Sequence, residues 1–314
     1  MEKSNWIEFA QATCHHAGID THSVDIIATW DDLYCANAIF KLDDDRYLKI
    51  FGPESGRQFQ VESAALRLLE TQNAIPAPRI LDDGQTAQKQ DYLLISGIPG
   101  ETAEHLWDDL PRPVQLELAR ELGTITAAIH RLPLDDFAAV EQKVGGIEWI
   151  IDKMQKRHIP RIKSLEAFTI EQREAILEFF TGEAHDLLFE SRTFTHYEMA
   201  HNHLYLQEQS GKMRVSGIID WADALIGPAE WDVVYLWFWT FSKDKDAMRE
   251  CLKTLYPNNP PPQNFARRCM AAAMYTASMG LLWSDLAEQG FNVDTVARDV
   301  TEIFFPPDVF GSPE

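Results

Sequence analysis

One short segment, FTHYEMAHNHLYL at residues 194–206, concentrates side chains that can bind a metal ion or move a proton. It contains His196, Glu198, His201 and His203. Imidazole and carboxylate groups at this spacing could ligate zinc in a hydrolase. The carboxylate could instead orient or deprotonate a hydroxyl group of a substrate. The residue types alone leave both chemistries open.

Three further charged residues lie in or beside apolar runs, where a charge needs a partner. Asp220 lies in the apolar stretch Gly217–Trp221. An unpaired carboxylate there would be costly, which favours a role in cation binding. Lys49 lies in the run Tyr47–Ile50, and Glu62 follows it on a segment with helical spacing. Lys49 and Glu62 could form an ordinary surface ion pair, which would contribute only about 0–1 kcal/mol to stability. Alternatively, Lys49 could bind phosphate groups while the Glu62 carboxylate holds it in position.

The first part of the chain, residues 22–97, has the pattern of a small α+β unit. Asp43-Asp44-Asp45 and Asp82-Asp83-Gly84 are interpreted as turns, and Pro76 and Pro78 would stop a helix. A short helix is expected at residues 4–18, followed by strands at 36–42 and 46–51. A helix at 59–69 and two further strands, one around Leu81 and one at 92–95, complete the unit.

Helices dominate beyond the sequence Ser96-Gly97-Ile98-Pro99-Gly100, which is typical of a hinge. A single hairpin interrupts them, with strands at Leu204–Leu206 and Met213–Ile219 and a turn at Gln209-Ser210-Gly211. The expected helices lie at residues 112–132, 146–157, 170–188, 229–241, 245–256, 264–288 and 293–304.

The order of these features resembles the aminoglycoside phosphotransferase and choline kinase family, the small-molecule relatives of protein kinases. That family has His-Gly-Asp, four further residues and Asn, then a hairpin that ends in Ile-Asp-Trp, and later an Asp that opens a helix. His196, Ile219-Asp220-Trp221 and Asp232 match this pattern. The resemblance implies a two-lobed, protein-kinase-like α+β fold. A nucleotide-binding lobe of antiparallel sheet plus helix would span residues 1–97, and a larger helical lobe with the catalytic loop and acceptor site would span residues 98–314.

The resemblance also implies which residues bind the nucleotide. Lys49 would bind the phosphates of ATP or GTP, and Glu62 would hold the lysine extended. Ile95 and Gly97, at the start of the hinge, would contact the nucleotide. Asp220 would bind Mg²⁺ or Mn²⁺. The reaction implied is transfer of the γ-phosphate to a hydroxyl group of a small molecule, which needs positioning and charge neutralisation more than covalent chemistry.

Three parts depart from the family pattern. Glu198 stands where the catalytic Asp belongs, and its extra methylene would move the carboxylate by about 1.5 Å, when a shift of about 1 Å can cost on the order of 100-fold in rate. His203 stands where the metal-binding Asn belongs, and imidazole suits manganese or zinc better than magnesium. The loop Trp30–Asn37, expected to cover the phosphates, has no glycine, and its Asp31 and Asp32 would repel a nucleotide that they faced.

Two functions remain open. In an active phosphotransferase, Glu198 would be the acceptor-side base or orienting carboxylate, His196 would support the catalytic loop, and His203 would be a second metal ligand. The alternative is a degenerate kinase fold that binds a nucleotide or another ligand with little or no catalysis. The three departures favour this alternative, and the intact Lys49, Glu62 and Asp220 oppose it. The zinc hydrolase is less favoured, because the kinase-like flanks already account for His196 and Glu198.

The composition narrows the possible partners. The 314 residues include 28 Lys and Arg against 49 Asp and Glu, a net charge of −21. No basic stripe of the kind that binds nucleic acid is present, whereas the carboxylates favour a small, polar, cationic acceptor. The start has no signal-peptide core and no apolar stretch reaches membrane length, so a cytoplasmic protein without membrane contact is expected. Its expected oligomeric state is a monomer or a homodimer. The carboxylates that could line an acceptor pocket are Asp223, Glu230, Asp285 and Glu288.

The remaining histidines and aromatic residues are expected to be structural. His130 and His158 are interpreted as ordinary core or surface residues. One aromatic group has helical spacing on at least one face and is expected to pack in the core, with a wall of the acceptor pocket as the alternative. Its members are Trp231, Tyr235, Trp237, Phe238 and Trp239.

Overall fold

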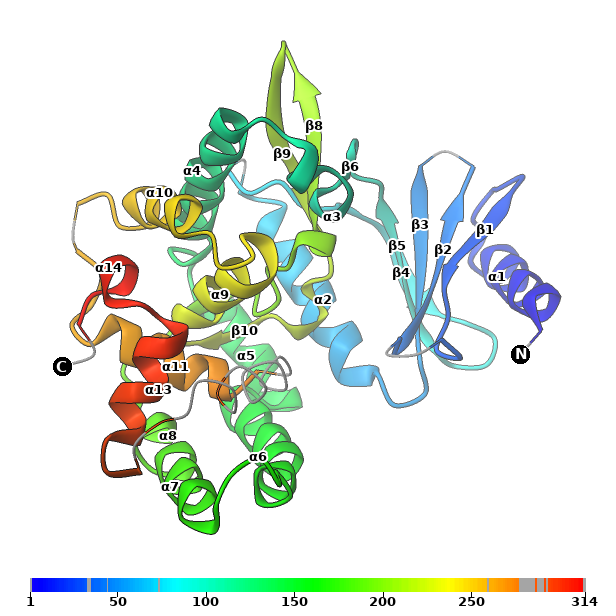
Figure 1. Ribbon diagram of the computed structural model, residues 1–314. Helices are drawn as coiled ribbons and strands as arrows, with labels where there is room; N and C mark the ends of the chain where they lie inside the picture. The colour runs from blue at the N-terminus through cyan, green and yellow to red at the C-terminus, as the bar shows by residue number, and fades with distance from the viewer. Residues whose placement is uncertain are drawn as a thin grey trace. The chain divides into compact units, whose positions relative to one another are not determined.

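The computed structural model is shown in Figure 1. It describes residues 2–32, 35–43, 45–72, 74–258, 260–276, 286, 291 and 293–312. The chain forms two compact units. The first comprises Met1–Leu106 and Asn202–Ala224, and the second comprises Trp107–His201 and Leu225–Glu314. The lobe boundary expected between residues 97 and 98 stays a prediction.

The first unit is built on a five-stranded antiparallel sheet with the strand order β1-β2-β3-β5-β4. Strand β3 is central, and its Lys49 pairs with Ile39 on one side and Leu93 on the other. Lys49 therefore lies in the middle of the sheet, on a strand that has four buried residues in a row. The strands are β1 (Val24–Ala28), β2 (Asn37–Leu42), β3 (Arg46–Phe51), β4 (Ile80–Gln85) and β5 (Asp91–Ser96).

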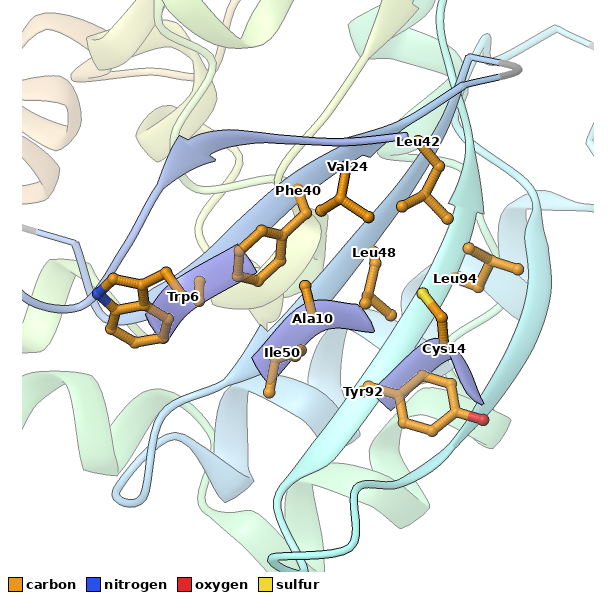
Figure 2. Packing of buried hydrophobic residues seen from close by; sticks show 11 residues of the cluster. Trp6, Ala10, Cys14, Val24, Phe40, Leu42, Leu48, Ile50, Tyr92 and Leu94 are labelled. Carbon is orange, nitrogen blue, oxygen red and sulfur yellow. The ribbon is translucent and has the colours of Figure 1, made fainter. Parts of the chain in front are cut away.

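Helix α1 (Lys3–Ala17) covers the sheet through residues spaced four apart. Trp6, Ala10 and Cys14 recur once per turn and therefore share one face of the helix. They pack against Phe40 and Leu48 of the sheet, as Figure 2 shows. Gly18, at a φ of +71°, ends the helix in the left-handed conformation that glycine adopts without strain.

The predicted hairpin and helix are confirmed, but one predicted turn is wrong. Strands β2 and β3 pair as expected, and helix α2 (Gly56–Leu69) ends before the two prolines. Asp82-Asp83-Gly84 lies inside β4, an edge strand whose residues alternate between exposed and half-buried. Acidic residues are common on the open side of an edge strand, where they block pairing with another chain. The true turn follows at Thr86–Gln90.

A second sheet in the first unit has the strand order β6-β8-β9. It consists of β6 (Glu101–Thr102), β8 (Leu204–Gln209) and β9 (Lys212–Ile218), and the short helix α3 (Ala103–Leu106) follows β6. Ser210 and Gly211 between β8 and β9 both have positive φ, as a tight two-residue hairpin turn requires. The hairpin predicted from the turn residues is therefore confirmed.

The second unit is mainly helical, as expected. The predicted helix at 170–188 divides at Gly182, and the one at 229–241 becomes π-helical at Leu236–Thr240. The helix predicted at 264–288 begins at Phe265, but 277–285 and 287–290 lie outside the described residues. The helices are α4 (Arg112–Ile129), α5 (Asp135–Val144), α6 (Ile147–Lys163), α7 (Ile170–Thr181), α8 (Glu183–Leu187), α9 (Glu230–Tyr235), α10 (Lys245–Leu255), α11 (Phe265–Met274), α13 (Val296–Phe304) and α14 (Pro307–Phe310).

Short elements connect the helices to the loops that carry the candidate site. Strands β7 (Thr193–Thr195) and β10 (Leu225–Gly227) pair antiparallel and bracket residues 196–224. Single 3₁₀ turns form at 107–109, 201–203, 221–223 and 293–295. Among the described residues, no helix combines the length and the apolar character that a membrane crossing requires.

Candidate active site

In the first unit, Lys49 forms the centre of a charged cluster. Its Nζ lies 2.7 Å from Glu62 Oε2 on helix α2 and 2.9 Å from Asp220 Oδ1 beyond β9. The side chains of Lys49 and Glu62 are only 5% and 3% exposed, whereas that of Asp220 is 38% exposed. The structure thus brings together three predicted site residues, and the cluster reaches solvent at the Asp220 carboxylate.

Burial and charge act in opposite directions on this cluster. Burial alone would lower the pKa of the Lys49 ammonium, but the carboxylates of Asp220 and Glu62 outweigh burial and raise it above its usual range. Burial raises the pKa of the Glu62 carboxyl to about 7, although Lys49 opposes that rise. Lys49 therefore stays charged.

Asp220 is placed by the turn that follows the hairpin. Its φ of +63° is left-handed, a conformation that Asp tolerates better than most residues. The next residue, Trp221, is fully buried and donates its indole N–H to Ile218 O at 2.9 Å. The apolar neighbours seen in the sequence thus fix this turn, and the carboxylate is paired with Lys49.

His203 lies beside Asp220, as expected for a second ligand. Its Nε2 is 3.7 Å from Asp220 Oδ2, and its carbonyl oxygen accepts the N–H of Ile219 at 3.0 Å. The Asp220 carboxylate fits a cation that a nucleotide brings with it, because Mg²⁺ commonly takes one or two carboxylates and completes its shell with phosphates and water. The His203 imidazole would suit Mn²⁺ better than Mg²⁺. The role of His203 as a ligand stays a prediction.

A zinc centre of the hydrolase type is not formed by the residues that the structure describes. Among them, no group of three or more His, Cys, Asp or Glu residues could hold a metal. His196 Nδ1 accepts the backbone N–H of Glu198 at 3.2 Å, and His201 Nδ1 is bonded to Trp239 O. Because His196 Nδ1 accepts a bond, the proton of its neutral ring is on Nε2, so His196 is poorly suited to ligate zinc in this arrangement.

In the second unit, Asp232 fixes the backbone of the loop that carries Glu198. It is fully buried, and its Oδ1 accepts the N–H of Tyr197 at 2.8 Å. Its Oδ2 accepts the N–H of His196 at 3.3 Å and lies 2.9 Å from His130 Nε2. Asp232 thus orients the backbone of this loop. His130, interpreted as a satisfied core or surface residue, is half-buried and bonds to this carboxylate, which lies 102 positions away in the sequence.

The side chain of Glu198 contacts a member of the aromatic group that was expected in the core or, as the alternative, in a wall of the acceptor pocket. Tyr235 donates its hydroxyl to Glu198 Oε1 at 3.2 Å. Glu198 itself is half-buried. The aromatic group is confirmed as largely core, since Trp231, Tyr235 and Trp237 are each at most 4% exposed. Helical spacing of aromatic residues indicates burial, but it gives no signal for a polar contact at the tip of the ring.

The two hinge residues predicted to contact a nucleotide lie at the end of strand β5. Ile95 pairs with Tyr47 of β3. Gly97 donates its N–H to Asp45 O at 2.6 Å, and a Cβ atom on it would lie 2.3 Å from that oxygen. Only glycine fits such a close backbone approach. Their contact with a nucleotide stays a prediction.

The acidic loop after β1 uses its carboxylates within the first unit. Asp31 Oδ2 accepts the indole N–H of Trp6 at 3.1 Å. Asp32 Oδ2 accepts the N–H of Thr29 at 2.6 Å and its hydroxyl at 3.0 Å. Neutral protein donors thus hold both carboxylates in place and leave their negative charges. Leu33 and Tyr34 of this loop lie outside the described residues.

Of the carboxylates expected to line an acceptor pocket, two lie among the described residues, and each of these lies near an arginine. Glu230 is 1% exposed and lies 2.6 Å from Arg268 Nε, so its assignment to the pocket is wrong. It was chosen by sequence region alone, and a buried acid needs such an ion pair. Asp223 lies 3.7 Å from Arg57 Nη1 in the first unit. Asp285 and Glu288 lie outside the described residues.

Solved structures of similar fold are aminoglycoside phosphotransferases. The GDP complex of wild-type aminoglycoside 2'-phosphotransferase-IIIa matches with a TM-score of 0.67 at 14% identity over 95% of this chain and 97% of that one. ADP-bound APH(2'')-Ib matches with a TM-score of 0.60 at 17% identity, over 95% and 96% of the two chains. The streptomycin-ATP-APH(2")-IIa ternary complex matches with 0.58 at 14% identity, over 97% and 98%. No curated protein matches the sequence.

The sequence also matches a family model directly. The model describes the phosphotransferase enzyme family and covers residues 36–261, which include Lys49, Glu62, Glu198 and Asp220. The match spans most of the chain, and the similar structures agree with it in fold. The chain therefore belongs to the phosphotransferase enzyme family, with the two-lobed, protein-kinase-like α+β fold of the aminoglycoside phosphotransferases.

Proposed function

We propose that the protein transfers the γ-phosphate of ATP or GTP to a hydroxyl group of a small, polar, cationic molecule. The observation that carries this proposal is the buried Lys49, held between Glu62 and Asp220 in a chain of the phosphotransferase enzyme family. A buried ammonium with two carboxylates is costly unless it serves a ligand or a fixed network. A nucleotide's phosphates are the ligand that this family uses.

On the nucleotide side, the proposal assigns roles to residues of the first unit. Lys49 binds the phosphates, and Glu62 keeps it extended. Ile95 and Gly97 contact the nucleotide at the hinge. Asp220 and His203 would hold Mg²⁺ or Mn²⁺, which supplies neutralisation of phosphate charge when bound. The lobe with residues 1–97 would bind the nucleotide, and the one with residues 98–314 would bind the acceptor.

On the acceptor side, Glu198 orients the acceptor's hydroxyl group or takes its proton. The acceptor oxygen then forms a bond to the γ-phosphorus, the bond from that phosphorus to the bridging oxygen breaks, and a nucleoside diphosphate leaves. His196 and Asp232 hold the loop in the folded state through their bonds to Glu198 N and to the loop backbone. Their contribution is orientation, which can determine several orders of magnitude in rate.

Two further observations support this choice of substrates. The similar structures are described as complexes with GDP, ADP or ATP, and one as a complex with GDP and kanamycin. The net charge of −21 favours cationic over anionic acceptors, because the field of the protein attracts the one and repels the other.

The test of the nucleotide site compares two lysines on neighbouring strands. Lys49→Ala should weaken binding of ATP with Mg²⁺ by about 10- to 100-fold in calorimetry, because charge-assisted bonds to phosphate are lost. Lys41→Ala is the matched control, because Lys41 is 40% exposed and pairs with Asp45. The control should bind as the wild type does. Unchanged affinity in a folded Lys49→Ala variant would remove Lys49 from the nucleotide site.

A further inference from the structure

The loop that carries Glu198 is fixed from one face of a single helix. Asp232 and Tyr235 lie three positions apart on α9 and therefore share a face. Asp232 accepts the backbone N–H groups of His196 and Tyr197, and Tyr235 donates to the Glu198 side chain. Every residue of α9 is buried, so both contacts come from a rigid element.

The ring of Tyr235 is itself held in place by Tyr197, a loop residue with an unusual backbone conformation. Tyr197 has a φ of +75°, a region that bulky side chains rarely occupy. Its hydroxyl donates to Tyr275 O at 3.0 Å, and its ring centroid lies 5.1 Å from that of Trp231 and 5.9 Å from that of Tyr235. The strained backbone thus places one aromatic ring against the next and limits the movement of Tyr235.

A glutamate in this position needs such a contact more than an aspartate would. Its side chain has one more rotatable bond, so more rotamers must be frozen before the carboxylate reaches a single place. A phenol that donates to one carboxylate oxygen selects the rotamers that keep the bond, and it favours the ionised form of the acid. Both effects suit a carboxylate that must meet an acceptor's hydroxyl group.

We propose that Tyr235 is a positioning residue that holds the Glu198 carboxylate in its catalytic orientation through the hydrogen bond from its hydroxyl to Oε1. The proposal rests on the proposed function, in which Glu198 faces the acceptor. It assigns to Tyr235 a role that acts through Glu198 and requires no contact between the tyrosine and either substrate.

The first test measures the contact without any turnover. The Glu198 carboxyl is titrated by ¹³C NMR in protein with labelled glutamate, and Glu198→Gln identifies its signal. Tyr235→Phe keeps the ring and removes the donor, so the pKa of Glu198 should rise by about one unit. Tyr275→Phe is the matched control, because its buried hydroxyl donates to Phe180 O at 2.9 Å. The proposal would be overturned if the pKa of Glu198 did not change in Tyr235→Phe, or if it rose equally in Tyr235→Phe and Tyr275→Phe.

The second test measures turnover in a double-mutant cycle. Tyr235→Phe should lower kcat by about 10- to 100-fold and leave the KM for the nucleotide unchanged, since a misplacement of about 1 Å can cost on the order of 100-fold. In a Glu198→Asp background the shorter side chain cannot keep the bond, so Tyr235→Phe should have no further effect. Equal losses in both backgrounds would contradict the positioning role. A wild type without phosphate transfer would refute the proposed function, whereas the titration would still decide whether Tyr235 holds Glu198.

Discussion

At the scale of single residues, His158 makes the stability of the helical unit depend on pH. It is fully buried and its Nε2 bonds to Thr276 O at 2.9 Å. Its Nδ1 has no hydrogen-bond partner among the described residues, so a proton there would be a buried, unpaired charge. Burial accordingly lowers the pKa of His158 to about 4.

This shift predicts a loss of stability on mild acidification. As the pH falls below about 6.5, the unfolded chain takes up a proton that the folded chain refuses until about pH 4, so the free energy of unfolding falls. Between pH 7.0 and 5.5 the contribution of His158 should fall by about 1 kcal/mol. Urea unfolding at the two pH values should show a smaller decrease for His158→Gln than for the wild type. The exposed His15 gives the control, and an equal decrease in His15→Gln and His158→Gln would refute the assignment.

The candidate site could be predicted only where a residue's own neighbours in the sequence carry the signal. Lys49 and Asp220 stand out because a charge within an apolar run needs a partner, and the structure pairs them at 2.9 Å. The contact of Tyr235 with Glu198 joins residues 37 positions apart, and that of His130 with Asp232 joins residues 102 apart. Such contacts depend on tertiary folding, which local periodicity does not encode.

At the scale of elements, helix α1 should contribute strongly to the stability of the first unit. Trp6 is 2% exposed, and its ring lies edge-on to Trp30 at 4.5 Å. Trp6→Ala should therefore lower the free energy of unfolding by about 3–5 kcal/mol, the usual cost of removing a large buried aromatic residue. Trp149, at 36% exposure, is the matched control, and Trp149→Ala should cost less than about 1 kcal/mol. Similar losses for both variants in urea unfolding would contradict the role of α1.

Long helices with one buried face were predicted well, whereas the short helix α5 and the edge strands were not. The period of four in α1 and the spacing in α2 and α4 mark helices that each bury one side, and all three form as expected. Strand β1 was missed, and part of β4 was interpreted as a turn. Both are outer strands of the sheet, where one side of the backbone has no partner strand and the sequence tolerates acidic residues.

At the scale of the whole molecule, the charge of the chain bears on its substrate. A net charge of −21 creates a field that speeds the encounter with cations. Salt screens such a field over about 8–10 Å near physiological ionic strength. An acceptor with several amino groups should therefore lose association rate as salt increases, whereas a neutral sugar should not.

A transfer screen measures phosphate transfer to a small cationic acceptor directly. Labelled γ-phosphate from ATP or GTP is offered, with Mg²⁺ or Mn²⁺, to aminoglycosides, choline analogues and neutral sugars. Wild type, Glu198→Gln and the exposed control Glu166→Gln are compared. If the proposed function holds, the wild type and the control transfer phosphate to a cationic acceptor, and Glu198→Gln loses at least about 100-fold of this activity. Nucleotide binding without transfer to any acceptor, or transfer that survives in Glu198→Gln, would contradict it.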